Sequence, residues 1–284
     1  MKILVTGATG FVGNYVIQEL LKNKHTVIAS SASEAKAAIF EWYSSVEYIP
    51  FRLEEYNEAT NYFEFFHQPD IMIHLAWEGL PNYKAVFHLE ENLPRHLRFL
   101  GNIIGNGLKD LTVTGTCFEY GMQEGKLSED MPAKPDNPYA QAKDSLRKEL
   151  QQLQGTKDFE LKWVRLFYMY GKGQSQKSLI SQLDKALEDN EPSFNMSAGE
   201  QVRDFLPVEK VATYIVAIAL QQQVTGVINC CSGKPVTVKQ FVEQYLAHLN
   251  RHIKLNLGYY PYADYEPMVF WGDDTKLKSI SNNL

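Results

Sequence analysis

The feature that most constrains this chain is a glycine-rich turn between an apolar run and a helical pattern. Residues 2–6 (KILVT) are apolar and strand-like, and residues 11–23 place apolar side chains at helical spacing. Gly7, Gly10 and Gly13 lie between and within these segments. The first glycine permits a tight turn, the second lets a pyrophosphate approach the backbone, and the third lets the helix pack close to the strand. In this strand-turn-helix context, the spacing predicts a dinucleotide-binding turn.

Strand and helix patterns alternate over the first 167 residues. The expected strands are 2–6, 26–29, 46–49, 70–75, 110–114 and 159–167. The expected helices are 11–23, 54–66, 84–106 and 138–154. This alternation predicts an α/β fold, with a Rossmann-type doubly wound parallel sheet covered by helices on both faces.

The pattern loosens after residue 170. Helices are expected at 178–189, 208–222 and 237–250, and extended pieces at 193–196, 226–230 and 253–257. The last 27 residues are expected to be irregular and are rich in aromatic side chains. We therefore expect an NAD(P)-binding domain over 1–170 and a smaller substrate-binding domain over 171–284, with 206–230 returning to the first domain.

Composition excludes several classes of function. The 284 residues carry a formal net charge of −6, without a basic patch that would favour nucleic acid. No apolar segment approaches the roughly 18 residues that a membrane span requires. The three cysteines at 117, 230 and 231 do not form a disulfide framework. The chain begins directly with a strand-like run, so we expect no signal peptide and a cytoplasmic location.

The end of the second expected strand bears on the cofactor. A carboxylate there favours NAD, because it binds the ribose 2′-hydroxyl and repels a phosphate. This chain has Ser30 and Ser31 at that place, and no acidic residue before Glu34. Arg52, just after the third strand, could add a positive charge. The sequence therefore favours NADP(H), with NAD(H) as the alternative.

A candidate catalytic pair begins the helix at 138–154. Tyr139 and Lys143 are four residues apart, so both side chains lie on one helix face. A nearby ammonium lowers a tyrosine pKa and lets the phenol exchange a proton near neutral pH. Thr114 ends the strand 110–114 and Thr116 follows it, at the sheet edge where open α/β folds bind ligands. A hydroxyl there could share a substrate carbonyl with Tyr139.

Six motifs occur in an order that resembles one enzyme family. They are TGATGFVG (6–13), HLAW (74–77), TGTCFEYG (114–121), PYAQAK (138–143), RLFYMYG (165–171) and EQVRDFLPVEKVA (200–212). The chain resembles an extended short-chain dehydrogenase/reductase of the nucleotide-sugar epimerase/dehydratase group, over nearly its whole length. The resemblance implies Thr116, Tyr139 and Lys143 as catalytic triad, and Arg203 as the residue that holds the nucleotide diphosphate.

The same resemblance implies the remaining site residues and a homodimer. Cofactor-binding residues are expected to be Gly7, Thr9, Gly10, Phe11, Val12, Ser30, Ser31, Arg52, Leu53, Leu75, Ala76, Trp77, Thr114, Tyr139, Lys143 and Leu166. Substrate-binding residues are expected to be Thr116, Cys117, Phe118, Tyr168 and Arg203. Helices 84–106 and 138–154 are expected to form the dimer's four-helix interface.

Departures from the family pattern narrow the reaction. The family's 4,6-dehydratases carry an acid pair after the threonine, where this chain has Cys117 and Phe118, so dehydration is not expected. We interpret Cys117 as a residue of the pocket wall. Tyr168 stands where the pattern often has Asn. His74 looks like a metal ligand, but we expect it to pack beside the cofactor loop, and we expect no metal.

The family resemblance leaves two candidate reactions. A 4-epimerase keeps NAD bound, whereas a 4-keto reductase exchanges NAD(P)H at every turnover. The missing acidic residue favours reduction, and HLAWEGLPNY with TGTCFEYG is similar to reductases of the dTDP-4-dehydro-6-deoxyglucose reductase type. These act on nucleotide-linked 4-keto-6-deoxyhexoses in bacterial surface-polysaccharide (O-antigen) pathways; dTDP is favoured over CDP or GDP. From another class, a non-catalytic NADP-binding sensor or scaffold remains the alternative.

Overall fold

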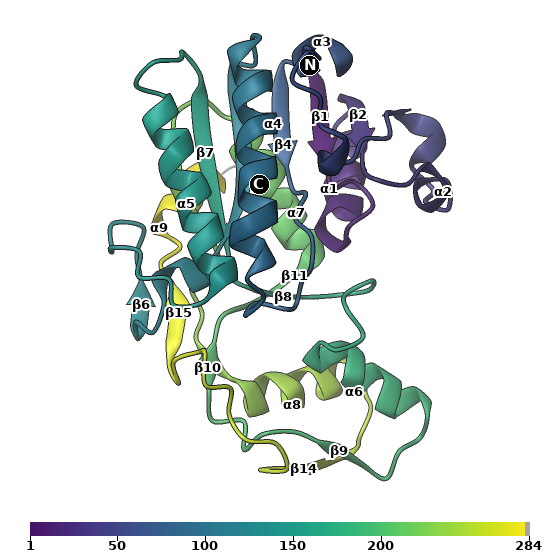
Figure 1. Ribbon diagram of the computed structural model, residues 1–284. Coiled ribbons are helices and arrows are strands. Elements are labelled where there is room, and N and C mark those ends of the chain that lie inside the picture. The colour runs from purple at the N-terminus through teal and green to yellow at the C-terminus, as the bar shows by residue number, and fades with distance from the viewer. Residues whose placement is uncertain (282–284) are drawn as a thin grey trace.

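A seven-stranded parallel sheet forms the centre of the molecule in a computed structural model, which describes residues 1–281 (Figure 1). Its order is β12-β7-β5-β4-β1-β2-β3. The strands are β1 (Lys2–Thr6), β2 (Thr26–Ser30), β3 (Glu47–Tyr48), β4 (Ile71–His74), β5 (Asp110–Thr116), β7 (Glu160–Leu166) and β12 (Gly226–Cys230). The connections change direction between β1 and β4, and a doubly wound sheet binds ligands at that point, outside the carboxyl ends of its strands.

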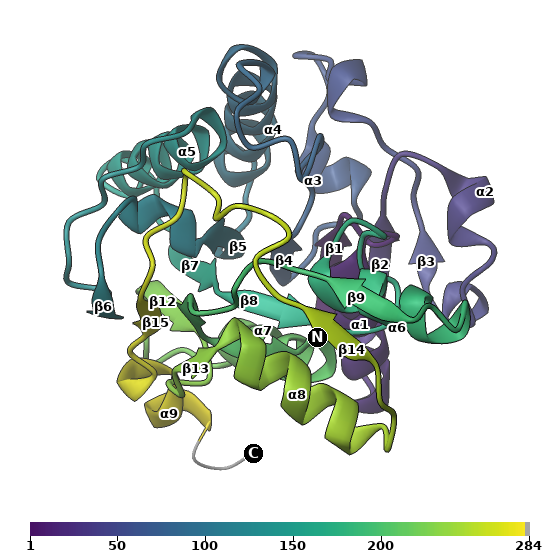
Figure 2. The ribbon, with the colours of Figure 1, turned by 90° about the horizontal axis from the view of Figure 1, so that it is seen from below.

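Alternating side chains of each strand divide the core into two layers. Ile3 and Val5 pack on one face of the sheet, and Leu4 packs on the other. The first face is covered by α1, α7 and α9, and the second by α3, α4 and α5 (Figure 2). The helices are α1 (Phe11–Lys22), α2 (Glu34–Ala37), α3 (Tyr62–Phe65), α4 (Leu93–Gly105), α5 (Pro138–Leu153), α6 (Leu179–Glu188), α7 (Val208–Leu220), α8 (Val238–His248) and α9 (Thr275–Ser281). No helix among residues 1–281 is long and apolar enough to cross a membrane.

A smaller lobe lies beyond the carboxyl ends of the strands (Figure 1). Its own apolar core joins α6, α8 and β9 (Ser193–Asn195), with Leu183, Phe194 and Val242 among its buried residues. The chain leaves the seven-stranded sheet after β7, forms β8 (Tyr168–Tyr170), and comes back through β11 (Phe205–Pro207), which pairs with β8. Helix α7 then packs on α1, and β12 extends the sheet beside β7.

Short strand pairs join the remaining segments. They are β6 (Gly125–Leu127) with β15 (Phe270–Gly272), β10 (Val202–Arg203) with β13 (Val236–Thr237), and β9 with β14 (Lys254–Asn256). The expectation of an irregular end was wrong over 270–281, where β15 and α9 form; residues 282–284 of the expected second domain lie outside the described part of the chain.

Two predicted helices are shorter than expected. The helix predicted over 54–66 is reduced to α3, because the Asn57 side chain accepts from the Ala59 backbone and Asn61 caps the helix start. The helix predicted over 84–106 becomes α-helical at Leu93, after one π-helical turn. Pro94 lacks an N–H, so it fits the first turn of α4 and not a helix interior.

Candidate active site

The glycine-rich turn forms a close-packed backbone cradle at the carboxyl end of β1. Gly7 has φ of 73°, and a Cβ there would lie 2.7 Å from the Ala76 backbone nitrogen. A Cβ on Gly13 would lie 2.2 Å from the Gly7 carbonyl oxygen, so only glycine lets α1 approach the turn. No side chain caps the N-terminus of α1, which leaves its first N–H groups free for an anion. The cradle fits the pyrophosphate of a dinucleotide.

A cavity of about 290 Å³ opens on the β2 side of this turn. Among the predicted cofactor residues it is lined by Gly7, Thr9, Gly10, Ser30, Ser31, Arg52, Leu53, Leu75, Ala76 and Trp77. The Ser31 hydroxyl accepts from Thr9 Oγ1 at 3.0 Å and lies 2.9 Å from the Tyr48 hydroxyl. Lys36 and Arg52 place two cationic side chains in the lining, and Glu78 adds one carboxylate to it.

A second cavity of about 470 Å³ lies on the other side of the turn. It brings together Gly7, Gly10, Phe11, Val12, Leu75, Trp77, Thr114, Thr116, Cys117, Phe118, Tyr139, Lys143, Leu166 and Tyr168 from the predicted set. Thr116 ends β5, and Tyr139 and Lys143 lie in the first two turns of α5. Asn137 caps that helix by accepting from the Ala140 backbone, which fixes the start of the turn that carries Tyr139. The three predicted catalytic side chains therefore line one cavity.

Two hydroxyl groups, those of Thr116 and Tyr139, line this cavity. Tyr139 is 7 % exposed, and burial raises its pKa, with the Thr116 hydroxyl opposing the shift. A raised pKa keeps the phenol protonated, as a proton donor must be. The Thr116 hydroxyl oxygen accepts from the Phe118 backbone at 3.3 Å, which leaves its own proton free to be donated.

The Lys143 ammonium lies in the interior beside Tyr139. Its Nζ donates to the Thr114 carbonyl at 2.8 Å and lies 4.0 Å from the centre of the Trp77 ring. Burial lowers the pKa of Lys143 to about 7, and the charge of Glu119 acts in the opposite direction. The ammonium therefore titrates close to neutral pH in this site.

His74 is packed in the interior beside the glycine-rich turn. Its Nδ1 lies 2.7 Å from Thr6 Oγ1, and its Nε2 lies 2.7 Å from His96 Nδ1. Burial lowers the pKa of His74 to about 3, with Lys143 adding to the shift, so the ring is neutral. Among residues 1–281, no group of three or more His, Cys, Asp or Glu side chains is arranged to hold a metal ion.

The wall of the 470 Å³ cavity around Thr116 is mainly apolar and aromatic. Burial raises the pKa of the Cys117 thiol, so it stays protonated and serves as wall. Tyr83 meets the Phe118 ring edge-on at 5.0 Å and Tyr139 at 5.5 Å. The Tyr168 hydroxyl is buried without a hydrogen-bond partner in the described chain, which suits a bond to a substrate group.

Arg203 is the predicted substrate residue that does not line this cavity. It is 3 % exposed, and its Nε and Nη2 donate to the Glu266 carboxylate at 3.3 and 2.8 Å. Its Nη1 donates to the carbonyls of Val202 and Met268. Four of the five N–H groups of Arg203 are thus occupied, two of them by Glu266. A diphosphate could bind this guanidinium only if Glu266 moved away.

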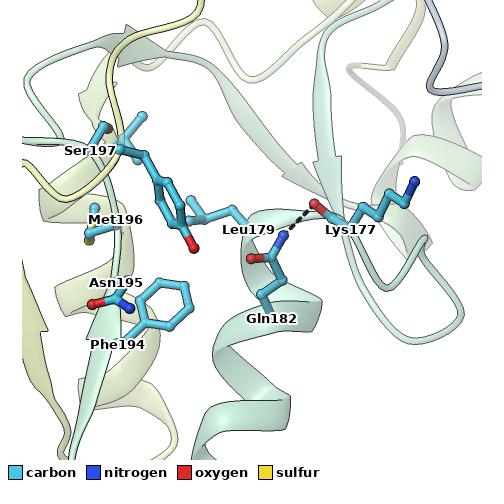
Figure 3. A pocket seen from close by; sticks show the side chains of 9 residues that line it. Lys177, Leu179, Gln182, Phe194, Asn195, Met196 and Ser197 are labelled. Atoms are coloured by element: carbon cyan, nitrogen blue, oxygen red, sulfur yellow. Dashed lines mark hydrogen bonds between the residues drawn. The ribbon is translucent and has the colours of Figure 1, made fainter.

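Another cavity, of about 450 Å³, lies in the smaller lobe (Figure 3). Its lining includes Lys177, Phe194, Met196 and Tyr260, from the loop before α6, from β9 with the residue that follows it, and from the segment after β14. Figure 3 shows the Gln182 amide donating to the Lys177 carbonyl, at 2.7 Å. Gln174 and Ser175 line the 470 Å³ cavity, so the segment 174–179 runs between the two.

Sequence reasoning missed several residues of the site. Lys36 lines the cavity because α2 begins at Glu34, shortly after β2 ends at Ser30. A lysine in a loop or a short helix carries no specific sequence signal. Tyr83 lies in the stretch HLAWEGLPNY, and its aromatic side chain close after the fourth strand was a usable signal for it. Glu266 is 63 residues from Arg203 in the chain, and nothing in the sequence pairs them.

The fold and the site define a class of protein: a Rossmann-type oxidoreductase with a tyrosine–lysine pair beside a dinucleotide cradle. The chain belongs to the NAD dependent epimerase/dehydratase family, whose model matches residues 3–231, and it is an oxidoreductase of the extended short-chain dehydrogenase/reductase type.

Several individual proteins resemble this chain over nearly its whole length. It is 30 % identical over 278 residues to dTDP-6-deoxy-L-talose 4-dehydrogenase (NAD(+)) of Aggregatibacter actinomycetemcomitans, covering 96 % of this chain and 99 % of that one. It is 27 % identical to GDP-6-deoxy-D-talose 4-dehydrogenase of the same organism, with 100 % and 92 % covered. A UDP-N-acetylglucosamine 4-epimerase structure from Methanobrevibacter ruminantium M1 has a TM-score of 0.85 at 21 % identity, covers 99 % and 91 % of the two chains, and confirms the fold.

Proposed function

We propose that this enzyme interconverts the C4 keto and hydroxyl groups of a nucleotide-linked 6-deoxyhexose, with a dTDP sugar as substrate and reduction by NADPH as the biosynthetic direction. The observation that carries the proposal is the convergence of Thr116, Tyr139 and Lys143 on one cavity with the dinucleotide turn. Two relatives that resemble the whole chain are named as 4-dehydrogenases of 6-deoxytalose nucleotides, which is the same chemistry at C4.

The wall of the cavity supports a keto reduction rather than a dehydration. Elimination of water needs an acid and a base next to the sugar, and Cys117 and Phe118 occupy the positions after Thr116. Burial holds the Cys117 thiol protonated, and Phe118 has no titratable group. An apolar wall of this kind also suits the methyl group of a 6-deoxy sugar.

The residues of the site supply the proton and hold the carbonyl. When bound, the reduced nicotinamide supplies the hydride to sugar C4. The Tyr139 hydroxyl donates its proton to the C4 oxygen, and the Thr116 hydroxyl hydrogen-bonds to the same atom. The Lys143 ammonium, on the same face of α5, stabilises the tyrosinate that remains.

The nucleotide end of the substrate fits the cavity of the smaller lobe. Phe194 and Tyr260 offer aromatic surface for a base. The segment 174–179 borders both cavities, so a substrate with its sugar beside Tyr139 can extend its nucleotide toward α6.

The adenosine end of the dinucleotide site supports NADPH. Ser30 and Ser31 stand where a carboxylate would select NAD, and Lys36 and Arg52 line the same cavity. The nearby Glu34 carboxylate accepts from the Tyr43 hydroxyl at 2.7 Å. The dTDP-6-deoxy-L-talose relative is named for NAD(+), so comparing the two cofactors is a direct test.

The decisive experiment follows NADPH and NADH oxidation with 4-keto-6-deoxyhexoses linked to dTDP, CDP and GDP. We expect net oxidation of NADPH, fastest with the dTDP sugar, and a loss of the NADPH preference in Lys36→Ala/Arg52→Ala. Tightly bound NAD with C4 inversion and no net cofactor consumption would instead show a 4-epimerase. Binding of NADPH without turnover of any of the three substrates would refute the reductase.

A further inference from the structure

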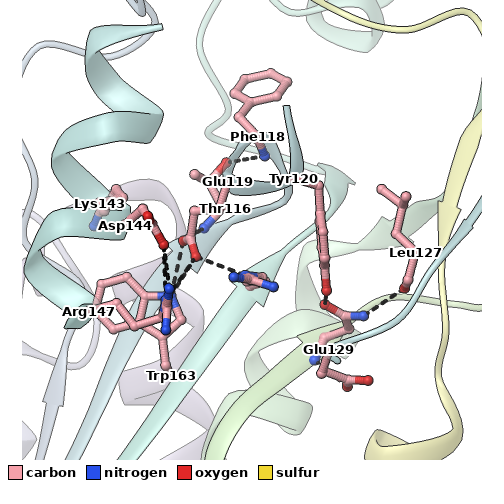
Figure 4. A network of polar contacts seen from close by, with 12 residues as sticks. Thr116, Phe118, Glu119, Tyr120, Leu127, Glu129, Lys143, Asp144, Arg147 and Trp163 are labelled. Carbon is pink, nitrogen blue, oxygen red and sulfur yellow. Dashed lines mark hydrogen bonds and ion pairs between the residues drawn. The ribbon is translucent and has the colours of Figure 1, made fainter. Parts of the chain in front are cut away.

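The carboxylate of Glu119 lies in the interior directly behind the catalytic threonine (Figure 4). Its Oε1 accepts from the Thr116 backbone N–H at 2.9 Å, and its two oxygens accept from the Trp163 indole at 3.0 and 3.1 Å. Its Oε2 also accepts from Arg165 Nε at 2.8 Å. Both oxygens face donors, which is the arrangement that an ionised carboxylate requires.

The surrounding chain is shaped to admit this group. A Cβ on Gly115 would lie 2.3 Å from Glu119 Oε1 and 2.2 Å from Trp163 Nε1, so glycine leaves the space that the carboxylate and the indole fill. Arg165 lies above the Tyr120 ring at 4.3 Å and is 2 % exposed. The buried Glu119 carboxylate is therefore held in place by its neighbours, and it accepts a hydrogen bond directly from the Thr116 backbone.

Glu119 also faces the helix that carries the tyrosine–lysine pair. Tyr139, Lys143 and Arg147 are spaced by four residues along α5, and Arg147 Nε lies 3.8 Å from Glu119 Oε2. Arg147 is itself paired with Asp144 on the same helix. Figure 4 shows Asp144 and Arg147 of α5 beside Glu119.

Several titratable groups surround the buried Lys143 ammonium. His74 on β4, His88 in the π-helical turn and His96 on α4 all have lowered pKa values, first through burial, and Lys143 adds to each shift, so their rings are neutral. Tyr139 on α5 has a raised pKa and is also neutral. Arg95 on α4 adds a positive charge near His96, and Trp77 presents its ring face to Lys143. Glu119 is the carboxylate that favours the charged form of Lys143.

We propose that Glu119 is a positioning residue, whose carboxylate fixes the Thr116 backbone and supplies the negative charge behind the Tyr139–Lys143 face of α5. This inference rests on the proposed function, because it assigns Glu119 through residues that touch the substrate. It extends the site to a residue that lines neither of the two cavities beside the dinucleotide turn.

The test compares Glu119→Gln and Glu119→Asp. The glutamine removes the charge and replaces one acceptor oxygen by an amide nitrogen, whereas aspartate keeps the charge and withdraws it by one methylene. Removing the charge lowers the pKa of both Lys143 and Tyr139, which must both be protonated for reduction. The alkaline limb of kcat/KM should therefore move to lower pH in Glu119→Gln, by about half a unit or more, and stay in place in Glu119→Asp, with a lower kcat.

Asp110→Asn is the matched control for stability. Asp110 begins β5 at the opposite end and pairs with buried Lys162 of β7 at 2.7 Å, as Glu119 pairs with Arg165. Both neutral variants leave a buried cation without its partner, so both should lower Tm. A shift of the alkaline limb in Asp110→Asn equal to that in Glu119→Gln, or none in Glu119→Gln, overturns the proposal.

A readout without substrate separates this inference from the proposed function. The Cε signal of Lys143, assigned with Lys143→Met, is titrated by ¹³C NMR in the wild type and the three variants. We expect a lower Lys143 pKa in Glu119→Gln alone, together with a moved Trp163 indole signal. If the wild type reduces none of the sugars, the proposed function fails while this titration still decides the role of Glu119. A Lys143 titration unchanged in Glu119→Gln overturns the inference whatever the activity.

Discussion

At the scale of single residues, the Tyr139 hydroxyl is the group whose removal should most directly stop the chemistry. Tyr139→Phe keeps the ring contacts with Tyr83 and Trp77 but has no proton to donate. We expect kcat to fall by about 10²- to 10⁴-fold, as for other lost general acids. NADPH affinity, measured by fluorescence titration, should stay near that of the wild type. Near-complete turnover in the variant would show that another group donates the proton.

The buried Lys143 ammonium should lower the stability of the fold while being needed for activity. Its native pKa of about 7 lies below the unfolded value of 10.5, so the unfolded chain binds more protons between these two pH values. The cost of burying the ammonium is therefore complete below pH 7 and disappears as the pH rises toward 10.5. Lys143→Met should be inactive yet more stable, by about 1–3 kcal/mol near pH 6.

The pH dependence of that gain is the critical measurement. Chemical denaturation of the wild type and Lys143→Met should give free energies of unfolding that converge toward pH 10. A constant difference across this range would mean that the methionine gains only by packing, and that the ammonium costs nothing in the native state.

At the scale of elements, the contact between α1 and the glycine-rich turn should control dinucleotide binding. In Gly13→Ala the new Cβ meets the Gly7 carbonyl, so α1 must move away from β1. We expect the Kd for NADPH to rise roughly tenfold or more, because the helix N-terminus loses its place against the phosphates. Gly101→Ala on α4 is the control: its Cβ meets no atom within 4 Å, and Kd should not change. An unchanged Kd in Gly13→Ala would contradict the fit.

The ion pair between Arg203 and Glu266 joins β10 to the segment that precedes β15. We expect Glu266→Gln to weaken this pair and lower the KM for the nucleotide sugar several-fold, because Arg203 becomes free for the diphosphate. Arg203→Met should raise the same KM. Steady-state kinetics with saturating NADPH measure both, and a higher KM in Glu266→Gln would mean that Glu266 itself binds the substrate.

Local sequence patterns predicted most of these elements, since β1, α1, β5, α5 and β7 depend on nearby periodicity and on caps such as Asn137. They also predicted which side chains meet at the carboxyl ends of parallel strands, because topology alone brings Gly7, Thr116 and Tyr139 together. They did not predict the partners of Arg203 or Glu119. Such pairs depend on how segments distant in the sequence pack against each other. Glu119 follows Cys117 by two residues, and its local sequence does not distinguish it from an ordinary turn residue.

At the scale of the whole molecule, α4 and α5 lie side by side on one face of the sheet (Figure 1). We propose that the same two helices of a second copy complete a four-helix interface about a two-fold axis. Light scattering after size exclusion should then give twice the 32.5 kDa of the chain. Arg98→Glu, on α4, should shift the measured mass toward that of a single chain. Lys148→Glu, in the second half of α5, should do the same if that part of the helix belongs to the interface. A monomeric wild type would contradict this arrangement.

The return of the chain through β11, α7 and β12 has a consequence for any attempt to divide the protein. The smaller lobe is not an appendix that can be cut off after Tyr170, because α7 buries apolar side chains against α1 and β12 covers the edge of β7. A truncated chain ending at Tyr170 would expose the edge of β7 and the apolar face that α7 covers. An exposed strand edge beside an apolar surface favours aggregation. An exchange of the smaller lobe between related proteins should therefore replace an internal segment, such as 171–204, and leave α7 and β12 in place.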